Sequence, residues 1–236
     1  MLINLRSFSW DGERPALSCS ILQALFSASG KTLKEISTTT LSAQIGREGI
    51  PLTSTPTRLH TLFISHAGIG ADMLSIDAQA VNSMARILEA NAHTLVRLTI
   101  LSDILWLCSV PSFVGLQELA FVFTGNFDDL PLIFRHCAVL TSLTILSIHP
   151  DELLPVLEAH PDALPTLTSF KFLNMGPDTL SEEEVDILFR FLQNKQRLRR
   201  LDLSVSAQSG ADQALLRLLP KLPALDALGY ELTLFD

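Results

Sequence analysis

A six-residue pattern, Leu-x-x-Leu-x-Leu, recurs along the chain and constrains its fold more than any other feature. The clearest copy is Leu198-Arg-Arg-Leu-Asp-Leu203. The fourth and sixth positions are apolar and alternate with polar ones, which indicates a short, half-buried β-strand. The first position packs beside them where the chain enters the strand. The first positions of the nine copies are Leu5, Leu33, Leu59, Leu95, Leu116, Leu143, Leu167, Leu198 and Leu225.

Three copies are less regular than the others. The first can also begin at Leu2, and Leu140 can replace Leu143 as the first position of the sixth. The copy at Leu33 is weak because Thr38 stands where a large apolar residue is expected. Consecutive first positions lie 21 to 36 residues apart. Most intervals are near the roughly 20–29 residues of a leucine-rich repeat.

Helical patterns lie between the expected strands. Met84, Ile87 and Leu88 share one helical face. Ser181-Glu-Glu-Glu184 has the spacing of a capping box, in which the serine oxygen and the third glutamate satisfy each other's backbone N–H groups. Asp151 is expected to cap a helix over 152–160. These patterns predict strands and helices that alternate along the whole chain.

Alternating strands and helices require right-handed crossovers between parallel strands, and stacked repeats bury the apolar face that one repeat cannot bury alone. We therefore expect an α/β fold. Its form is an irregular leucine-rich-repeat solenoid, with a parallel sheet on the concave side and helices on the convex side. It would be a single domain over residues 1–236 with about nine repeats. No terminal caps are recognisable, so we expect self-association through the ends.

Composition excludes several classes of partner. The formal charge is −8 and no basic cluster exceeds Arg197 to Arg200, which argues against nucleic acid. No segment approaches the roughly 18 apolar residues of a membrane span, and no signal peptide is recognisable. Cys19, Cys108 and Cys137 show neither metal spacing nor a disulfide framework, and are interpreted as buried thiols in a reducing compartment. These features predict a soluble protein of the cytoplasm or nucleus.

The sequence contains no motif that carries catalytic chemistry. A G-x-S-x-G elbow, a phosphate-binding glycine loop and an H-E-x-x-H zinc motif are all absent. The six histidines share no ligand spacing. We expect no catalytic residue, metal or cofactor, and therefore a protein that is not an enzyme.

The third, fifth and seventh positions of each copy should point to the concave surface. In the middle repeats they combine apolar residues with neighbouring charges, the layout of a site for a protein or peptide. The register decides this assignment, because a shift of one residue would move these side chains into the core. The candidate partner-binding residues are Phe63, Arg97, Thr99, Leu101, Glu118, Val122, Ile145, His149, Lys171 and Leu173.

Three segments, 5–37, 149–172 and 180–205, resemble the leucine-rich-repeat portions of fungal F-box-type proteins. The resemblance covers nearly the whole chain, with degenerate motifs. It implies a substrate-recognition module of a ubiquitin ligase, in which an N-terminal F-box binds the Skp adaptor and the repeats bind the substrate. The F-box is absent before the first repeat here, so only the recognition half carries over. The alternatives are a ligase-independent scaffold or inhibitor, or a truncated gene product without its own activity.

Overall fold

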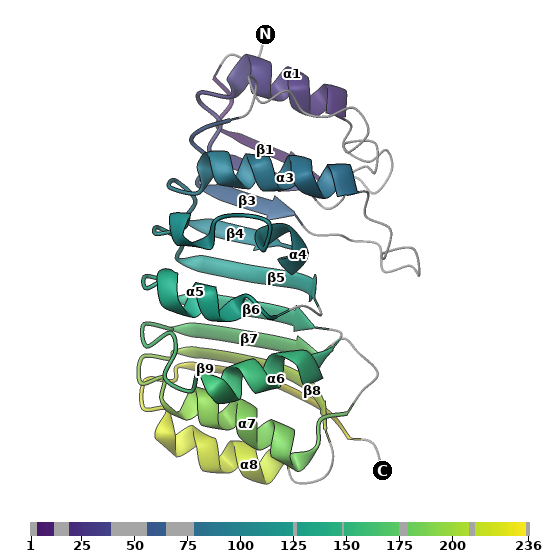
Figure 1. Cartoon of the computed structure of the whole chain (residues 1–236). Coiled ribbons are helices and arrows are strands. Elements are labelled where there is room, and N and C mark those ends of the chain that lie inside the picture. The colour runs from purple at the N-terminus through teal and green to yellow at the C-terminus, as the bar shows by residue number, and fades with distance from the viewer. Residues whose placement is uncertain are drawn as a thin grey trace. The chain divides into compact units, whose positions relative to one another are not determined.

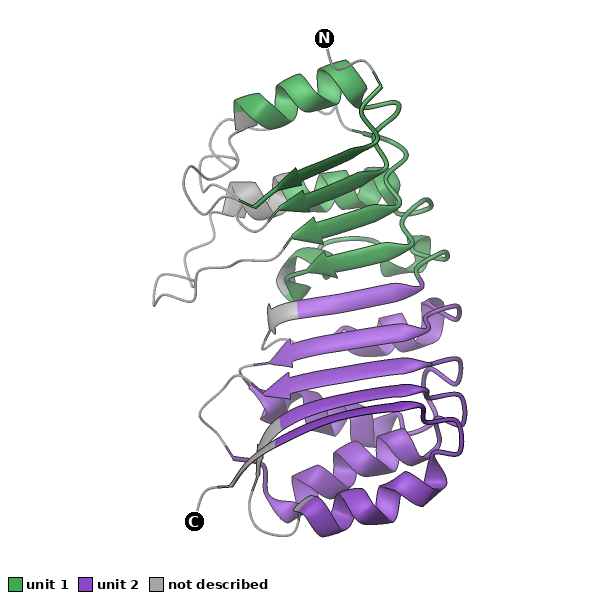
Figure 2. Cartoon of the chain, turned by 180° about the vertical axis from the view of Figure 1, so that it is seen from behind, with its two compact units in different colours: residues 1–116 green, residues 117–236 purple. Residues whose placement is uncertain are grey.

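The computed structural model describes residues 4–11, 19–38, 56–64, 78–124, 127–147, 149–174, 179–207 and 211–234. The chain divides into two compact units, residues 1–116 and 117–236, coloured separately in Figure 2. Each unit alternates strands with helices, and its strands pair in parallel in chain order. The predicted α/β architecture with parallel strands is confirmed, whereas the single domain stays a prediction.

The described part of unit 1 has four strands, β1 (Ser7–Trp10), β2 (Glu35–Thr38), β3 (Thr61–Ile64) and β4 (Arg97–Ile100). The helices α1 (Cys19–Ser29) and α3 (Ala78–Asn91) lie on one side of these strands (Figure 1). After β4 the chain forms only a short α4 (Ser102–Leu105) and a 3₁₀ turn η2 (Val110–Ser112). The short interval between Leu95 and Leu116 leaves no room for a longer helix.

Among the residues described in unit 2 there are five strands, β5 (Glu118–Thr124), β6 (Ser142–Ser147), β7 (Ser169–Asn174), β8 (Arg200–Ala207) and β9 (Ala227–Leu234). Between them run α5 (Leu130–His136), α6 (Pro150–Ala159), α7 (Glu182–Gln193) and α8 (Ala211–Leu218), followed by a 3₁₀ turn η3 (Leu219–Lys221). These helices also lie on one side of their strands (Figure 1).

Two helix starts test the sequence rules. The capping box at α7 is confirmed, since Ser181 N donates to Glu184 Oε2 at 2.7 Å and Glu184 N donates to Ser181 Oγ at 3.3 Å. The predicted cap at Asp151 is wrong, because α6 begins one residue earlier, at Pro150, and Asp151 lies in its first turn. Proline suits the first helical position because the N–H group that it lacks would have no intrahelical partner there.

The first positions of the repeat form the centre of each core. Seven of these leucines are completely buried, as are the fourth positions in β6, β7 and β8, whereas Leu5 and Leu225 are partly buried. The fully buried first positions are Leu33, Leu59, Leu95 and Leu116 in unit 1 and Leu140, Leu167 and Leu198 in unit 2.

A backbone motif joins each repeat to the next within a unit. The carbonyl of the residue before a strand accepts two N–H groups, one from the residue before the next strand and one from that strand's first residue, at 2.7–3.1 Å. For example, Arg6 O accepts from Lys34 N and Glu35 N. The motif fixes the stacking register independently of the side chains. The accepting carbonyls are those of Arg6, Lys34 and His60 in unit 1 and Gln117, Thr141, Thr168 and Arg199 in unit 2.

Candidate functional site

The strand side chains that point away from the helices form what we call the open face of each unit. Strand residues alternate between the two sides of a sheet, so the open face follows from the pairing register. Figure 2 views both units from this side, with the strands in front of the helices. The unit 1 open face contains Ser7, Ser9, Glu35, Ser37, Thr61, Phe63, Arg97 and Thr99. The unit 2 open face contains Glu118, Ala120, Ser142, Thr144, Leu146, Ser169, Lys171, Leu173, Arg200, Asp202 and Ser204.

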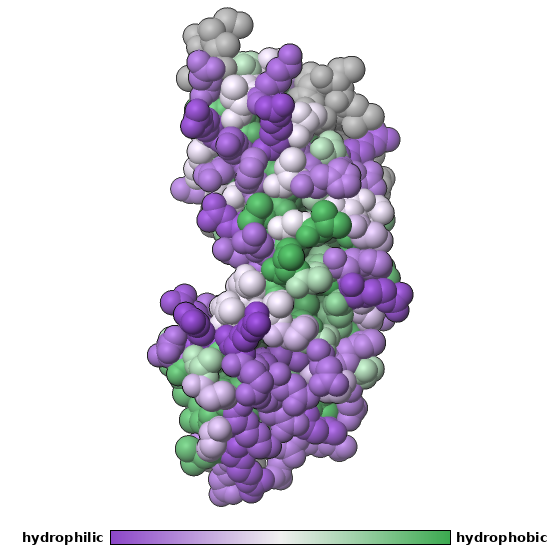
Figure 3. All heavy atoms as spheres, turned by 90° about the vertical axis from the view of Figure 1, so that its left-hand side faces the viewer, coloured by the Kyte–Doolittle hydropathy of each residue, from purple (hydrophilic) through white to green (hydrophobic). Residues whose placement is uncertain are grey.

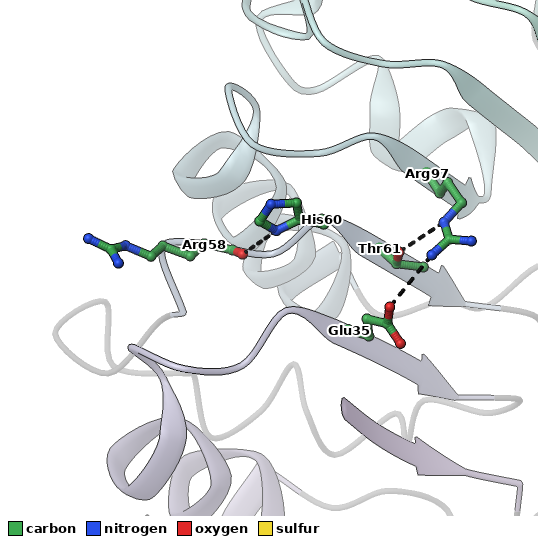
Figure 4. Close-up of polar contacts among 5 residues, drawn as sticks. All are labelled: Glu35, Arg58, His60, Thr61 and Arg97. Carbon is green, nitrogen blue, oxygen red and sulfur yellow. Dashed lines mark hydrogen bonds and ion pairs between the residues drawn. The ribbon is translucent and has the colours of Figure 1, made fainter. Parts of the chain in front are cut away.

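One row of the unit 1 open face is a polar network across three strands. Glu35, Thr61 and Arg97 occupy paired positions on β2, β3 and β4. Arg97 Nε donates to Thr61 Oγ1 at 3.1 Å, and Arg97 Nη2 lies 3.5 Å from Glu35 Oε1. Figure 4 shows the arginine reaching across Thr61 towards the glutamate. About half of each charged side chain remains exposed, so the network fixes their positions while leaving them accessible.

The adjacent row places an aromatic ring beside this network. Phe63 is paired with Ser37 on β2 and Thr99 on β4. The phenylalanine is 37% exposed, and its two small neighbours leave the ring uncovered. Leu101, one residue after β4, is partly buried at the N-cap of α4. Unit 1 therefore presents an apolar anchor next to a fixed pair of opposite charges.

His60 lies beside this face but not within it. It precedes β3, and its Nδ1 is 2.9 Å from the carbonyl oxygen of Arg58. The Arg58 guanidinium points away from the Glu35–Arg97 pair (Figure 4). The histidine is thus explained by a local backbone contact.

The unit 2 open face has its own charge pair and apolar pair. Lys171 on β7 and Asp202 on β8 are paired in register, with Nζ 3.9 Å from Oδ2. Leu146 on β6 and Leu173 on β7 are also paired and partly exposed. The leucines lie in the row next to the charges, so the arrangement has the same elements as in unit 1.

Gly229 on β9 contributes to the position of Asp202. The two residues are paired in register, and a side chain at 229 would collide with the Asp202 carboxylate. The absence of a Cβ at this position lets the carboxylate lie over the neighbouring strand. The glycine therefore allows the Asp202 carboxylate to approach the backbone of β9, the strand next to β8.

The assignment of Ile145 to the binding surface is wrong, because its side chain is completely buried. The sixth repeat begins at Leu140 rather than Leu143, and Leu143 is the fourth position, pairing with Leu119 and Phe170. Both leucines fit the pattern, and the choice of the later one shifted the outward positions by three residues. The residues that do face outwards on β6 are Ser142, Thr144 and Leu146.

The remaining candidates fall into three groups. Arg97, Thr99, Glu118, Lys171 and Leu173 occupy open-face positions, as the pattern predicted. The side chain of Val122 lies outside the described residues, although its backbone belongs to β5. His149 is exposed but precedes α6 rather than lying in a strand, and its backbone N–H donates to Ser147 Oγ at 3.1 Å.

Sequence reasoning missed a buried lysine on the helix side of unit 2. Lys195 follows α7 and is 1% exposed. Its Nζ donates to the carbonyl oxygen of Pro161 at 2.7 Å and lies 4.0 Å from the ring centre of Phe191. Burial lowers the pKa of Lys195 to about 8, against the opposing effect of the nearby Asp162 carboxylate. Its partners lie 34 residues away or on the preceding helix, so no local pattern marks it.

The described residues offer little reactive chemistry. Burial raises the pKa of Cys108 to about 12, with a smaller contribution from Glu89, and burial raises that of Cys137 to about 11. Both are buried thiols outside any disulfide, as expected, so little thiolate forms near neutral pH. The side chain of Cys19 is not among those described. Within the described ranges, no three His, Cys, Asp or Glu side chains are grouped to hold a metal ion.

Apolar side chains are also exposed away from the open faces. Leu107 and Val114 in unit 1 are 52% and 59% exposed, and Leu216 on α8 is 66% exposed. Figure 3 shows a further side of the molecule, on which hydrophobic areas interrupt a largely hydrophilic surface. Exposure alone therefore does not distinguish the open faces. Their distinguishing property is an apolar side chain held next to a cross-strand ion pair.

No protein-family model and no curated protein matches the sequence. Searched over its described helices, the chain has none that is both long and apolar enough to cross a membrane. Any functional conclusion therefore rests on the fold and on the two open faces.

Proposed function

We propose that the protein is a non-enzymatic protein–protein interaction module and that its open faces bind a protein or peptide partner. The observation that carries the proposal is the repeated combination of apolar anchor and ion pair. In unit 1, Phe63 lies in the row next to the Glu35–Arg97 pair. In unit 2, Leu173 lies in the row next to the Lys171–Asp202 pair, on the same strand as Lys171.

Energetics support a binding role for these charges. Exposed ion pairs typically stabilise a fold by only about 0–1 kcal/mol, so folding does not require them. Charges at the rim of an interface instead orient a partner and accelerate encounter, while buried apolar anchors supply most of the affinity. Neighbouring parallel strands hold both kinds of side chain in fixed register. The face is thus arranged in advance for a complementary surface.

The finer proposal is an irregular leucine-rich-repeat solenoid that recognises substrates for a ubiquitin ligase inside the cell. It rests on the repeat spacing and on the resemblance to F-box-type proteins. Cys108 and Cys137 are buried and form no disulfide, which agrees with a reducing compartment. Detection of ubiquitin conjugates on the captured partner would distinguish this role from that of a ligase-independent scaffold or inhibitor.

The experiment is quantitative affinity capture from cells that contain the protein, with the tagged chain and single charge-introducing variants. We expect Phe63→Glu or Leu173→Glu to reduce recovery of a specific partner at least tenfold. Val114→Glu and Leu216→Glu are matched controls, because they add the same charge at exposed apolar positions outside the open faces. Thermal unfolding of every variant verifies that the fold survives.

The comparison separates the open faces from the remaining surface. Loss of the partner in either open-face variant, with retention in both controls, would support the proposal. Full recovery with Phe63→Glu and Leu173→Glu combined would show that the partner binds elsewhere. Equal losses in all four variants would indicate a general effect of added charge and would also contradict it.

A further inference from the structure

Among the described residues, the backbone motif that joins consecutive repeats is incomplete at β1 and at β9, the two edge strands of the sheet. Asp226 precedes β9 and is the counterpart of Arg199, whose carbonyl accepts from Asp226 N at 2.8 Å and Ala227 N at 2.9 Å. No described residue donates to the Asp226 carbonyl in turn. In unit 1, the Arg6 carbonyl accepts from the next repeat, but the N–H groups of Arg6 and Ser7 have no acceptor among the described residues.

The two edges are complementary in polarity. The edge at β9 offers the acceptor of the motif, and the edge at β1 offers its two donors. A parallel contact between β9 of one molecule and β1 of another would repeat the intramolecular arrangement. Seven such carbonyls already make this contact inside the units, at 2.7–3.1 Å.

Across such a contact, the side chains of β9 that point to the core side of the sheet would pair with those of β1 that also point to the core side. Continuing the register would pair Ala227-Leu-Gly-Tyr230 with Ser7-Phe-Ser-Trp10. Leu228 and Phe8 both occupy core-side positions, because their intramolecular partners are the buried Leu201 and Ile36.

Both core-side positions are incompletely buried. Leu228 is 43% exposed, whereas its neighbour Leu201 is completely buried. Phe8 is also partly exposed, and its ring stacks with that of Trp10 at 6.4 Å between centroids. An added strand would cover these apolar groups and remove them from water.

Charge complementarity also favours this pairing. The same register places Asp226 opposite Arg6, and both side chains are exposed. Opposite charges in directly paired positions stabilise strand pairing, whereas like charges destabilise it. One position opposes association, since the register continued past the end of β1 would place Glu231 opposite Asp11. The other five pairs favour or tolerate the contact.

The geometry points to a second copy of this chain as the occupant of the open β9 edge, docked through its β1 edge in parallel and in continuous register. Such a contact is heterologous: it uses two different surfaces, so each molecule retains one free edge of each kind. Association therefore proceeds beyond a dimer unless the arrangement closes into a ring.

The test is sedimentation velocity of the full chain over a hundredfold range of concentration. We expect the mean mass of the unmodified protein to rise with concentration. Leu228→Lys should block the β9 edge and Phe8→Lys the β1 edge, because a charge on an edge strand opposes pairing. Each variant alone should remain monomeric, with Ala227→Lys as the control that adds the same charge on the outward side of β9.

Mixing the two variants gives the decisive result. An equimolar mixture should form a dimer and stop there, because the only compatible edges are one intact β9 and one intact β1. A mixture that stays monomeric would overturn the proposal, as would a monomeric unmodified protein. Self-association of either single variant would indicate a contact between like edges, and inhibition by Ala227→Lys equal to that by Leu228→Lys would exclude the core-side contact.

A charge exchange tests the register without disturbing the apolar positions. Asp226→Arg or Arg6→Asp alone should weaken association several-fold, since each places like charges opposite one another. The double variant should restore it. Failure of the double variant to recover association would contradict the predicted register, and the exposed position of both residues makes misfolding an unsuitable explanation.

Discussion

Asn91, at the end of α3, is the buried polar residue on which the conformation before β3 depends most directly. It is 1% exposed and makes three hydrogen bonds. Its Oδ1 accepts from Leu59 N at 2.9 Å, and its Nδ2 donates to Pro56 O at 2.8 Å and Ile87 O at 2.7 Å. The side chain thus holds the segment from which β3 and Phe63 follow.

Asn91→Ala removes all three bonds and leaves the buried Leu59 N–H without this acceptor. An unsatisfied buried donor costs about 1–3 kcal/mol, and with the weakened carbonyls we expect a total loss of about 3 kcal/mol. Asn91→Asp should be worse, although it preserves size. Its second oxygen would face two carbonyl oxygens, and its charge would be buried.

The aspartate variant also predicts a pH dependence. Burial raises the pKa of such a carboxyl, so its destabilisation should be small near pH 4, where the protonated group can donate again, and should grow as pH rises towards 7. Urea unfolding followed by circular dichroism measures each free energy of unfolding. Asn194→Ala is the control, because that asparagine is exposed and makes one side-chain bond, to Asp162. Wild-type stability of Asn91→Asp at pH 7 would refute the reasoning.

Further predictions concern the register and the buried lysine. Ile145→Ala should cost roughly 2–5 kcal/mol and Thr144→Ala little, measured by urea unfolding; the reverse order would restore the outward assignment of Ile145. Leu201→Ala should likewise cost about 2–5 kcal/mol while Asp202→Ala remains nearly neutral, and equal losses would contradict the β8 register. Because burial lowers the pKa of Lys195 to about 8, the free energy of unfolding should rise between about pH 8 and the ordinary lysine pKa, as the unfolded chain alone retains the proton. Lys195→Met should lack that rise in a pH series, and an unchanged rise in this variant would assign it to another group.

The parts of the fold that depend on local patterns could be predicted from the sequence. Alternation at Leu201, Asp202 and Leu203 gave the correct register of β8, since one side is buried and the other is not. The capping box was recognisable because Ser181 and Glu184 are three residues apart, and the side chain of each accepts a hydrogen bond from the backbone N–H of the other.

Where two alignments fit equally well, the sequence could not decide. Leu140 and Leu143 are both apolar and both completely buried, and only the pairing of Ser142 with Glu118 and Ser169 distinguishes their positions. Long-range contacts could not be predicted from the sequence either. The partner of Lys195 is a backbone carbonyl, which every residue carries, so no residue type marks it in advance.

In the candidate site, too, local alternation could be predicted from the sequence and long-range contacts could not. Phe63 and Arg97 were assigned to one surface by alternation, and the structure places them in adjacent rows. The contact between Arg97 and Glu35 was not foreseen, because it spans two strand boundaries and 62 residues of sequence.

The central claim is that a partner contacts the open faces, and site-specific photo-crosslinking tests it most directly. A photoreactive amino acid would replace Thr99, next to Phe63 on the unit 1 open face, or Val114, exposed outside it. After irradiation in cells that contain the protein, we expect a discrete crosslinked partner from position 99 and none from position 114. Crosslinks to the same partner from position 114 but not from position 99 would contradict the account.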